Sequence, residues 1–75
     1  MLFRNFVPMK NTTMLKAMLL KYSILLDMDD DGNFKMVLTD KQSKKAETVG
    51  AESYSFVIRK AYSYLLQELR NIDKQ

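Results

Sequence analysis

The sequence predicts an α+β domain in which an antiparallel β-hairpin, or a three-stranded sheet, packs against a long C-terminal helix. Two period-2 runs, residues 22–28 and 33–39, flank a turn rich in Asp and Gly. This pattern is a strong short-range signal for a hairpin, here over residues 22–39. Residues 53–72 then repeat apolar side chains at spacings of three and four, without an internal Gly or Pro. That repeat is typical of one face of a helix.

Residues 1–10 are interpreted as an N-terminal arm. The segment is apolar but aperiodic, and Pro8 interrupts any helix. Two phenylalanines on an arm are expected to dock on a protein surface rather than sit in water. Phe3 and Phe6 are therefore candidate interface residues.

The segment after this arm predicts a short helix that gives way to a strand. Residues 11–13, Asn-Thr-Thr, can accept hydrogen bonds from the free N–H groups of a first helical turn. The apolar residues that follow lie at the spacings of one helical face: Leu15, Met18, Leu19 and Tyr22. No stop signal occurs before Leu26, so a single long strand over residues 14–28 remains the alternative. We prefer the short helix.

The hairpin strands are expected to present one apolar face, because side chains alternate across a strand. That face consists of Ile24, Leu26 and Met28 on the first strand and Phe34, Met36 and Leu38 on the second. Residues 46–49 can add a third short strand, which Gly50 is expected to break. Glu52 or Ser53 then begins the long helix. Its stripe is formed by Tyr54, Ile58, Ala61, Leu65, Leu69 and Ile72.

Composition excludes several functions. At 75 residues the chain is expected to form one domain, residues 1–75, with a small core. It has no Cys and no His, so disulfides, thiolate-bound zinc and the commonest general base are missing. No glycine-rich phosphate loop or nucleophile elbow occurs. We therefore expect no enzyme activity, no catalytic residues, no cofactor and no small-molecule substrate.

No membrane contact is expected either. The longest apolar stretch, residues 14–26, is interrupted by Lys16 and Lys21, and no small-residue cleavage site follows it. Neither a transmembrane span nor a signal peptide fits this pattern. The expected location is cytoplasmic.

The acidic run Asp27-Met28-Asp29-Asp30-Asp31-Gly32 holds four of the nine acidic residues of the chain. Asp27, Asp29, Asp31 and Gly32 match the first half of an EF-hand calcium loop, and these three aspartates are the candidate metal ligands. The twelfth loop position should be a glutamate, but it is Leu38. A carboxylate from elsewhere, such as Asp40 or Glu47, would have to complete the shell. The preferred interpretation is a hairpin turn with solvated aspartates.

The functional hypothesis is protein binding through an apolar interface. A chain without other staples carries more apolar surface than one small core can hide, as at Leu25 and Val37. The remaining candidate interface residues lie on the last helix: Phe56, Tyr62, Tyr64 and Leu66. The expected partner is another protein or a second copy, as a homodimer. The abundance of Met and Lys is typical of small accessory or inhibitory proteins of phages and mobile elements.

The alternative hypothesis is nucleic-acid binding. The net charge is +3, which permits contact with phosphates but is a weak footprint. Aromatic residues interleaved with cations on the last helix could also stack on bases. The candidate cations are Lys41, Lys44, Lys45, Arg59 and Lys60.

The order of elements from Tyr22 to Leu69 resembles that of the small HicB-like antitoxin domains. The resemblance depends on the turn at residues 29–32, the alternation around Phe34 and the glycine before the helix. It implies a hairpin covered by a helix. The family's Pro-Asp-Leu-Pro-Gly-Cys signature and its C-terminal DNA-binding segment are absent, and the first twenty residues are additional.

Overall fold

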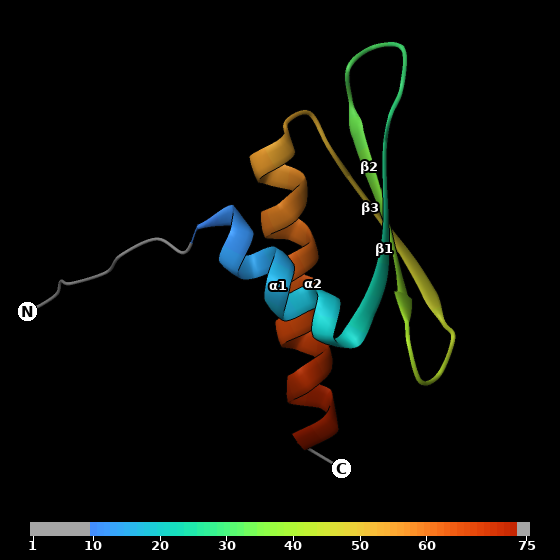
Figure 1. Ribbon diagram of the computed structural model, residues 1–75, viewed down its shortest axis with the longest axis vertical. Coiled ribbons are helices and arrows are strands. Elements are labelled where there is room, and N and C mark those ends of the chain that lie inside the picture. Colours follow the sequence, from blue (N-terminus) through green and yellow to red (C-terminus); the bar gives the residue numbers. More distant parts are fainter. Residues whose placement is uncertain (1–9, 74–75) are drawn as a thin grey trace, which may run out of the picture.

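The computed structural model describes residues 10–73, which form an α+β domain with two helices and one sheet (Figure 1). The elements follow in the order α1 (Asn11–Lys21), β1 (Tyr22–Met28), β2 (Phe34–Asp40), β3 (Ala46–Ala51) and α2 (Tyr54–Asp73). The predicted arm, including Phe3, Phe6 and Pro8, lies almost entirely outside the described residues. The predicted hairpin, third strand and C-terminal helix are all confirmed.

The sheet is antiparallel with the strand order β1-β2-β3. Leu25, Val37 and Thr48 lie opposite one another across the three strands, and so do Leu26, Met36 and Val49. Because successive side chains point to opposite faces, the first row lies on one face and the second on the other. Both helices pack on the face that carries Met36 (Figure 1).

The core lies between this sheet face and the two helices. Met36 and Leu38 are fully buried on the central strand, which is the strand that the helices cover best. The other buried side chains come from α1, the first residue of β1 and α2: Met14, Met18, Tyr22, Val57, Ile58, Ala61 and Leu65. No helix covers the opposite sheet face within residues 10–73, and there the side chain of Leu25 is 66% exposed.

The question of helix or strand after Asn11 is resolved in favour of the helix. The helix begins where expected, but the N-cap is Lys10, whose side chain makes no capping bond. The Asn11 amide instead donates to the Ser55 hydroxyl at 3.1 Å, which ties the start of α1 to α2. The expected apolar face is also rotated: Met14 is buried, whereas Leu19 is 46% exposed.

Gly50 does not break the third strand, contrary to expectation. β3 continues to Ala51, and Gly50 pairs with Lys35 of β2. A Cβ at this position would meet only the Phe34 carbonyl oxygen at 3.5 Å, an ordinary contact. β3 ends at Ala51 and α2 begins at Tyr54. The Ser53 hydroxyl accepts the Phe56 N–H at 3.1 Å and so caps the start of this helix.

The apolar face predicted for β1 is covered only along its first half. Tyr22 is buried and Ile24 is half-buried, but Leu26 and Met28 are 42% and 57% exposed. β1 is an edge strand that follows directly from α1, so the helices lie against its beginning and the hairpin turn extends past them (Figure 1). Sequence alternation identified the correct face but could not show how far the helices reach along it.

Candidate functional site

The acidic run forms the turn of the β1–β2 hairpin, as the preferred interpretation predicted. The Asp29 carboxylate accepts the N–H groups of Asp31 and Asn33 at 2.9 and 3.0 Å. The backbone closes through the Asp29 N–H, which donates to the Asn33 carbonyl at 2.9 Å. Gly32 has a φ of 85°, a conformation that glycine adopts without steric cost. The turn therefore satisfies its own donors with one aspartate.

Asp29 is held in its charged form by these bonds. The N–H of Asn33, followed by those of Asp31 and Gly32, lowers the pKa of the Asp29 carboxyl below its ordinary value. The Asp27 carboxylate is engaged in a similar way, because it accepts the Met28 N–H at 2.8 Å. Both carboxylates therefore already accept hydrogen bonds from backbone N–H groups in the turn or at the end of β1.

No three acidic side chains within residues 10–73 come together in a way that would hold a metal ion. Leu38, at the position where a calcium loop needs a glutamate, is fully buried in the core. Asp40 cannot complete a shell with Asp31, because it pairs with Tyr22 at the opposite end of the hairpin. The calcium hypothesis stays a prediction, with Asp27, Asp29 and Asp31 as its ligands.

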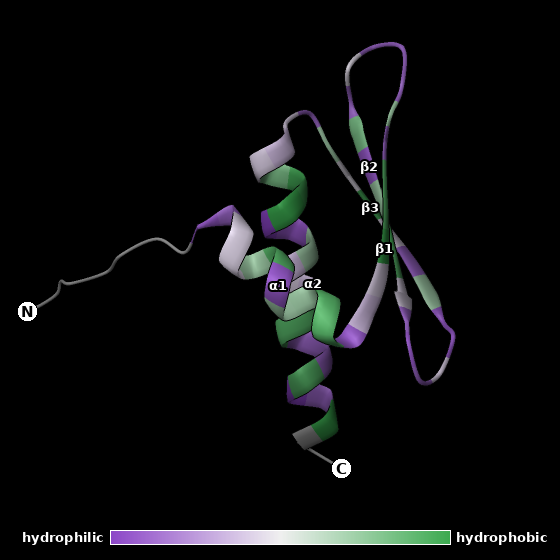
Figure 2. Cartoon of the chain, viewed as in Figure 1, coloured by the Kyte–Doolittle hydropathy of each residue, from purple (hydrophilic) through white to green (hydrophobic). Residues whose placement is uncertain are grey.

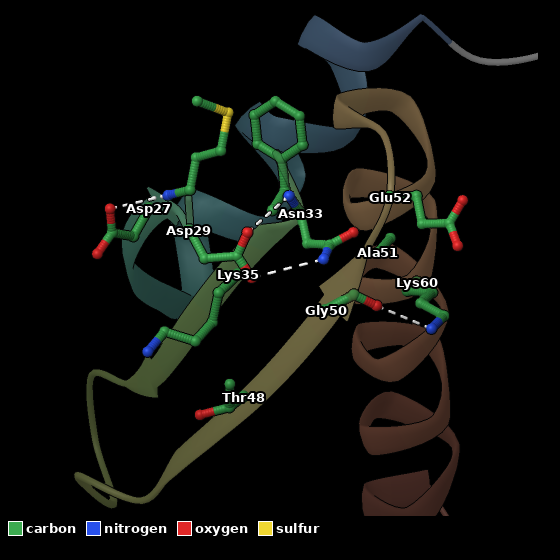
Figure 3. A pocket seen from close by; sticks show the side chains of 11 residues that line it. Asp27, Asp29, Asn33, Lys35, Thr48, Gly50, Ala51, Glu52 and Lys60 are labelled. Carbon is green, nitrogen blue, oxygen red and sulfur yellow. Dashed lines mark hydrogen bonds between the residues drawn. The ribbon is translucent and has the colours of Figure 1, made fainter. Parts of the chain in front are cut away.

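A hollow of about 600 Å³ lies beside this turn and along β3. Figure 3 shows carboxylates and amines of opposite charge around it, with Asp29 bound to Asn33 on one side and Lys60 on the other. The Lys60 ammonium donates to the Gly50 carbonyl at 2.8 Å. The walls carry both signs of charge, from Asp27, Asp29, Glu52, Lys35 and Lys60.

The candidate interface residues on α2 fall into two groups. Phe56 is 60% exposed and Leu66 is 39% exposed, so both are available to a partner. Tyr62 and Tyr64 instead pack against the core as half-buried residues. The Tyr64 ring lies 6.1 Å from the buried Tyr22 ring. Phe3 and Phe6 lie outside the described residues.

Tyr22 is the most enclosed aromatic residue of the fold. Its side chain is 2% exposed, and its hydroxyl has no hydrogen-bond partner among residues 10–73. Burial, together with the nearby Glu68 carboxylate, raises the pKa of Tyr22 to about 12. Burial also raises the pKa of Tyr64. These tyrosines act as core residues that keep their protons at neutral pH.

Sequence reasoning missed a further apolar surface. Leu20 on α1 is 85% exposed, and it lies in the last turn before β1. Leu26 and Met28 are further exposed apolar side chains, on β1, and Figure 2 shows the hydrophobic middle of this strand below the hydrophilic hairpin turn. The only sequence signal was the length of the apolar run from residue 14 to 28. An apolar run of this length fits a helix or a strand, and it does not indicate which of its side chains are exposed.

The basic candidates do not form one cluster. The Lys41 ammonium donates to the Leu19 carbonyl at 2.7 Å, at the β2–β3 end of the sheet. Lys60 lies beside Gly50, which is four residues along β3 from Ala46. At about 3.3 Å per residue that places Lys60 about 13 Å beyond the loop that holds Lys44 and Lys45. The loop and the α2 cations, Arg59 included, are separate positive sites.

Comparisons with known proteins identify no relative. No protein-family model matches the chain, and no characterised protein or solved structure shows significant similarity to it. The resemblance to HicB-like antitoxins therefore remains a likeness in the order of elements. Within residues 10–73, neither helix has the length and apolar character needed to cross a membrane.

Proposed function

We propose that this chain is a non-enzymatic accessory protein of the cytoplasm that binds proteins through its exposed apolar surface, in the first place a second copy of itself. The observation that carries the proposal is the number of large apolar side chains that the fold leaves exposed. They are Leu19, Leu20, Leu25, Leu26, Met28, Tyr54, Phe56, Leu66, Leu69 and Ile72.

Single exposed apolar residues are common on protein surfaces, but contiguous ones mark binding sites. Here they follow one another along elements. Leu26 and Met28 share one face of β1, Leu25 lies on the opposite face, and Leu19 and Leu20 lie in the helical turn that precedes the strand. A partner strand beside β1 has side chains on both faces, so it would remove several of these apolar side chains from water, and each such burial contributes on the order of 1 kcal/mol or more.

The end of α2 offers a second apolar surface. Leu65, Leu69 and Ile72 follow the spacing of the core stripe, yet only Leu65 is buried. This helix therefore carries more apolar face than the sheet and α1 cover. A small domain without disulfides gains stability when such surface is buried against another chain.

Sedimentation of the purified chain tests the proposal. We expect a mass above the 8.8 kDa of one chain at micromolar concentration. We also expect a dissociation that changes little with salt, because apolar burial is not screened. A single 8.8 kDa species at high micromolar concentration would overturn self-association. Association only with added DNA or RNA, lost steeply as salt rises, would favour the nucleic-acid alternative instead.

A further inference from the structure

We propose that two copies associate through the free edge of β1, paired antiparallel about a two-fold axis at Leu25. Two three-stranded sheets would then become one continuous sheet. This pairing rests on the proposed function, because it supplies a surface and a partner for it.

Within residues 10–73, the centre of the β1 edge carries backbone groups that no other strand pairs with. Two bonds bracket the hairpin: the Asp29 N–H to the Asn33 carbonyl at one end, and the Lys41 N–H to the Lys21 carbonyl at the other. Bonded and non-bonded pairs alternate in an antiparallel ladder, so the odd-numbered residues of β1 face β2. Ile24 and Leu26 therefore direct N–H and C=O away from β2, to a side where residues 10–73 provide no strand. Such an edge is a template for another strand.

The other edge of the sheet is better protected. The Asp40 N–H donates to the Lys45 carbonyl, so by the same alternation Thr48 and Gly50 face outward from β3. At Gly50 the Lys60 ammonium, which comes from α2, already occupies the outward carbonyl at 2.8 Å. A charged side chain on an edge opposes strand addition. At the β1 edge the N–H groups of Tyr22 and Met28 are also bonded, to the Met18 carbonyl and the Asp27 carboxylate, so the stretch left for a second copy is the centre of the strand, at Ile24 and Leu26.

The sequence of β1 is complementary to itself. With the axis at Leu25, all seven residues of the strand find a partner, and Ile24 lies opposite Leu26 of the second copy. Ser23 lies opposite Asp27 of the second copy, so no like charges face each other. A shift by one residue would place residues that face β2 opposite residues that face outward. It would also place side chains of the helix-covered face opposite side chains of the other face. A two-fold interface needs this kind of self-complementary surface.

The helix layer supports the same arrangement. A two-fold axis perpendicular to the sheet keeps the helices of both copies on one face. The last turn of α1, with the exposed Leu20, lies at the Tyr22 end of β1. Antiparallel pairing brings that turn to the Met28 end of the second copy, where Leu26 and Met28 are exposed. Each copy thus offers apolar side chains where the other lacks cover.

Two variants and one control test the pairing by sedimentation. Leu26→Pro removes an N–H that faces away from β2, so it should spare the hairpin and block the second copy. Leu25→Lys places two ammonium groups opposite each other on the axis. We expect each to weaken association at least about tenfold, which corresponds to about 1.4 kcal/mol. Gln67→Lys introduces the same charge on α2, at an exposed residue outside the candidate interface, and should leave association unchanged.

Hydrogen exchange of the wild-type chain provides a test without substitutions. The amides of Ile24 and Leu26 should exchange slowly at high protein concentration and quickly after dilution, while the outward amide of Thr48 stays fast in both. Fast exchange of Ile24 and Leu26 at both concentrations would overturn the pairing.

The outcomes separate this pairing from the proposed function. A wild-type chain that is monomeric overturns the pairing together with self-association. A wild-type dimer that survives both Leu25→Lys and Leu26→Pro overturns the β1 pairing and leaves protein binding in place. Dissociation by both β1 variants, with their circular dichroism and melting curves intact, supports the pairing.

Discussion

At the residue scale, the pair Lys21–Asp40 joins the end of α1 to the end of β2. The Lys21 ammonium lies 2.7 Å from the Asp40 carboxylate, and both side chains are mostly shielded from solvent. The same carboxylate accepts the N–H groups of Gln42 and Ser43 at 2.8 and 3.0 Å. Asp40 therefore fixes the start of the β2–β3 loop as well as the junction with the helix. In the sequence Lys41, Lys44 and Lys45 follow Asp40 closely, so the sequence could not show that Lys21 would be the cation that meets this aspartate.

These contacts predict a loss of stability in acid. The hydrogen bond from Lys21, followed by those from Ser43 and Gln42, holds the pKa of Asp40 well below its ordinary value of 3.8. A depressed carboxyl pKa stabilises the fold above pH 3.8, and this contribution is lost as pH falls further. Asp40→Asn should lower the urea midpoint at pH 7 and flatten its decline below pH 4. A variant whose pH profile parallels that of the wild type would contradict this assignment.

At the scale of the elements, local chemistry decided the hairpin. The Asp-Gly turn and the alternation on either side were sufficient to place β1 and β2 within one residue. Gly50 was misjudged because a glycine signals a break only when its backbone needs a special conformation. The φ of Gly32 is positive and that of Gly50 is not, and a sequence does not display this difference.

Alanine at the two glycines should therefore have opposite effects. Gly32→Ala forces a left-handed backbone on a residue with a Cβ, and we expect it to lower the free energy of unfolding by about 1 kcal/mol. Gly50→Ala adds a side chain to a strand interior with room for it, so stability should stay unchanged or rise slightly. Urea unfolding of both variants checks the contrast. Equal destabilisation at the two sites would show that turn geometry is not the cause.

At the scale of the whole molecule, the sequence predicted the fold class but not the exposed surface. Stripes and alternation identify which side chains share a face, and Ile58, Ala61 and Leu65 are buried as expected. They do not reveal where a covering element stops, because that depends on the crossing of α1 and α2 over the sheet. Leu26 and Ile72 therefore fit the pattern and still remain exposed.

The protection of β3 also leads to a prediction at this scale. Lys60→Ala frees the outward carbonyl of Gly50, and we expect species larger than a dimer to appear at high concentration. Arg59→Ala removes the same charge from the neighbouring position and leaves the Gly50 bond in place. Sedimentation velocity distinguishes the two variants. Identical distributions of sedimentation coefficients would show that the Lys60 contact does not prevent strand addition at β3.

The unequal edges have a consequence for the size of any assembly. If both edges of a sheet accept strands, each added copy exposes a fresh edge, and growth continues into a filament. When only the β1 edge accepts a strand, two copies pair through their β1 edges. The dimer then exposes only its two β3 edges, to which no further copy can add. A single ammonium–carbonyl contact between α2 and β3 would then separate a finite particle from a polymer.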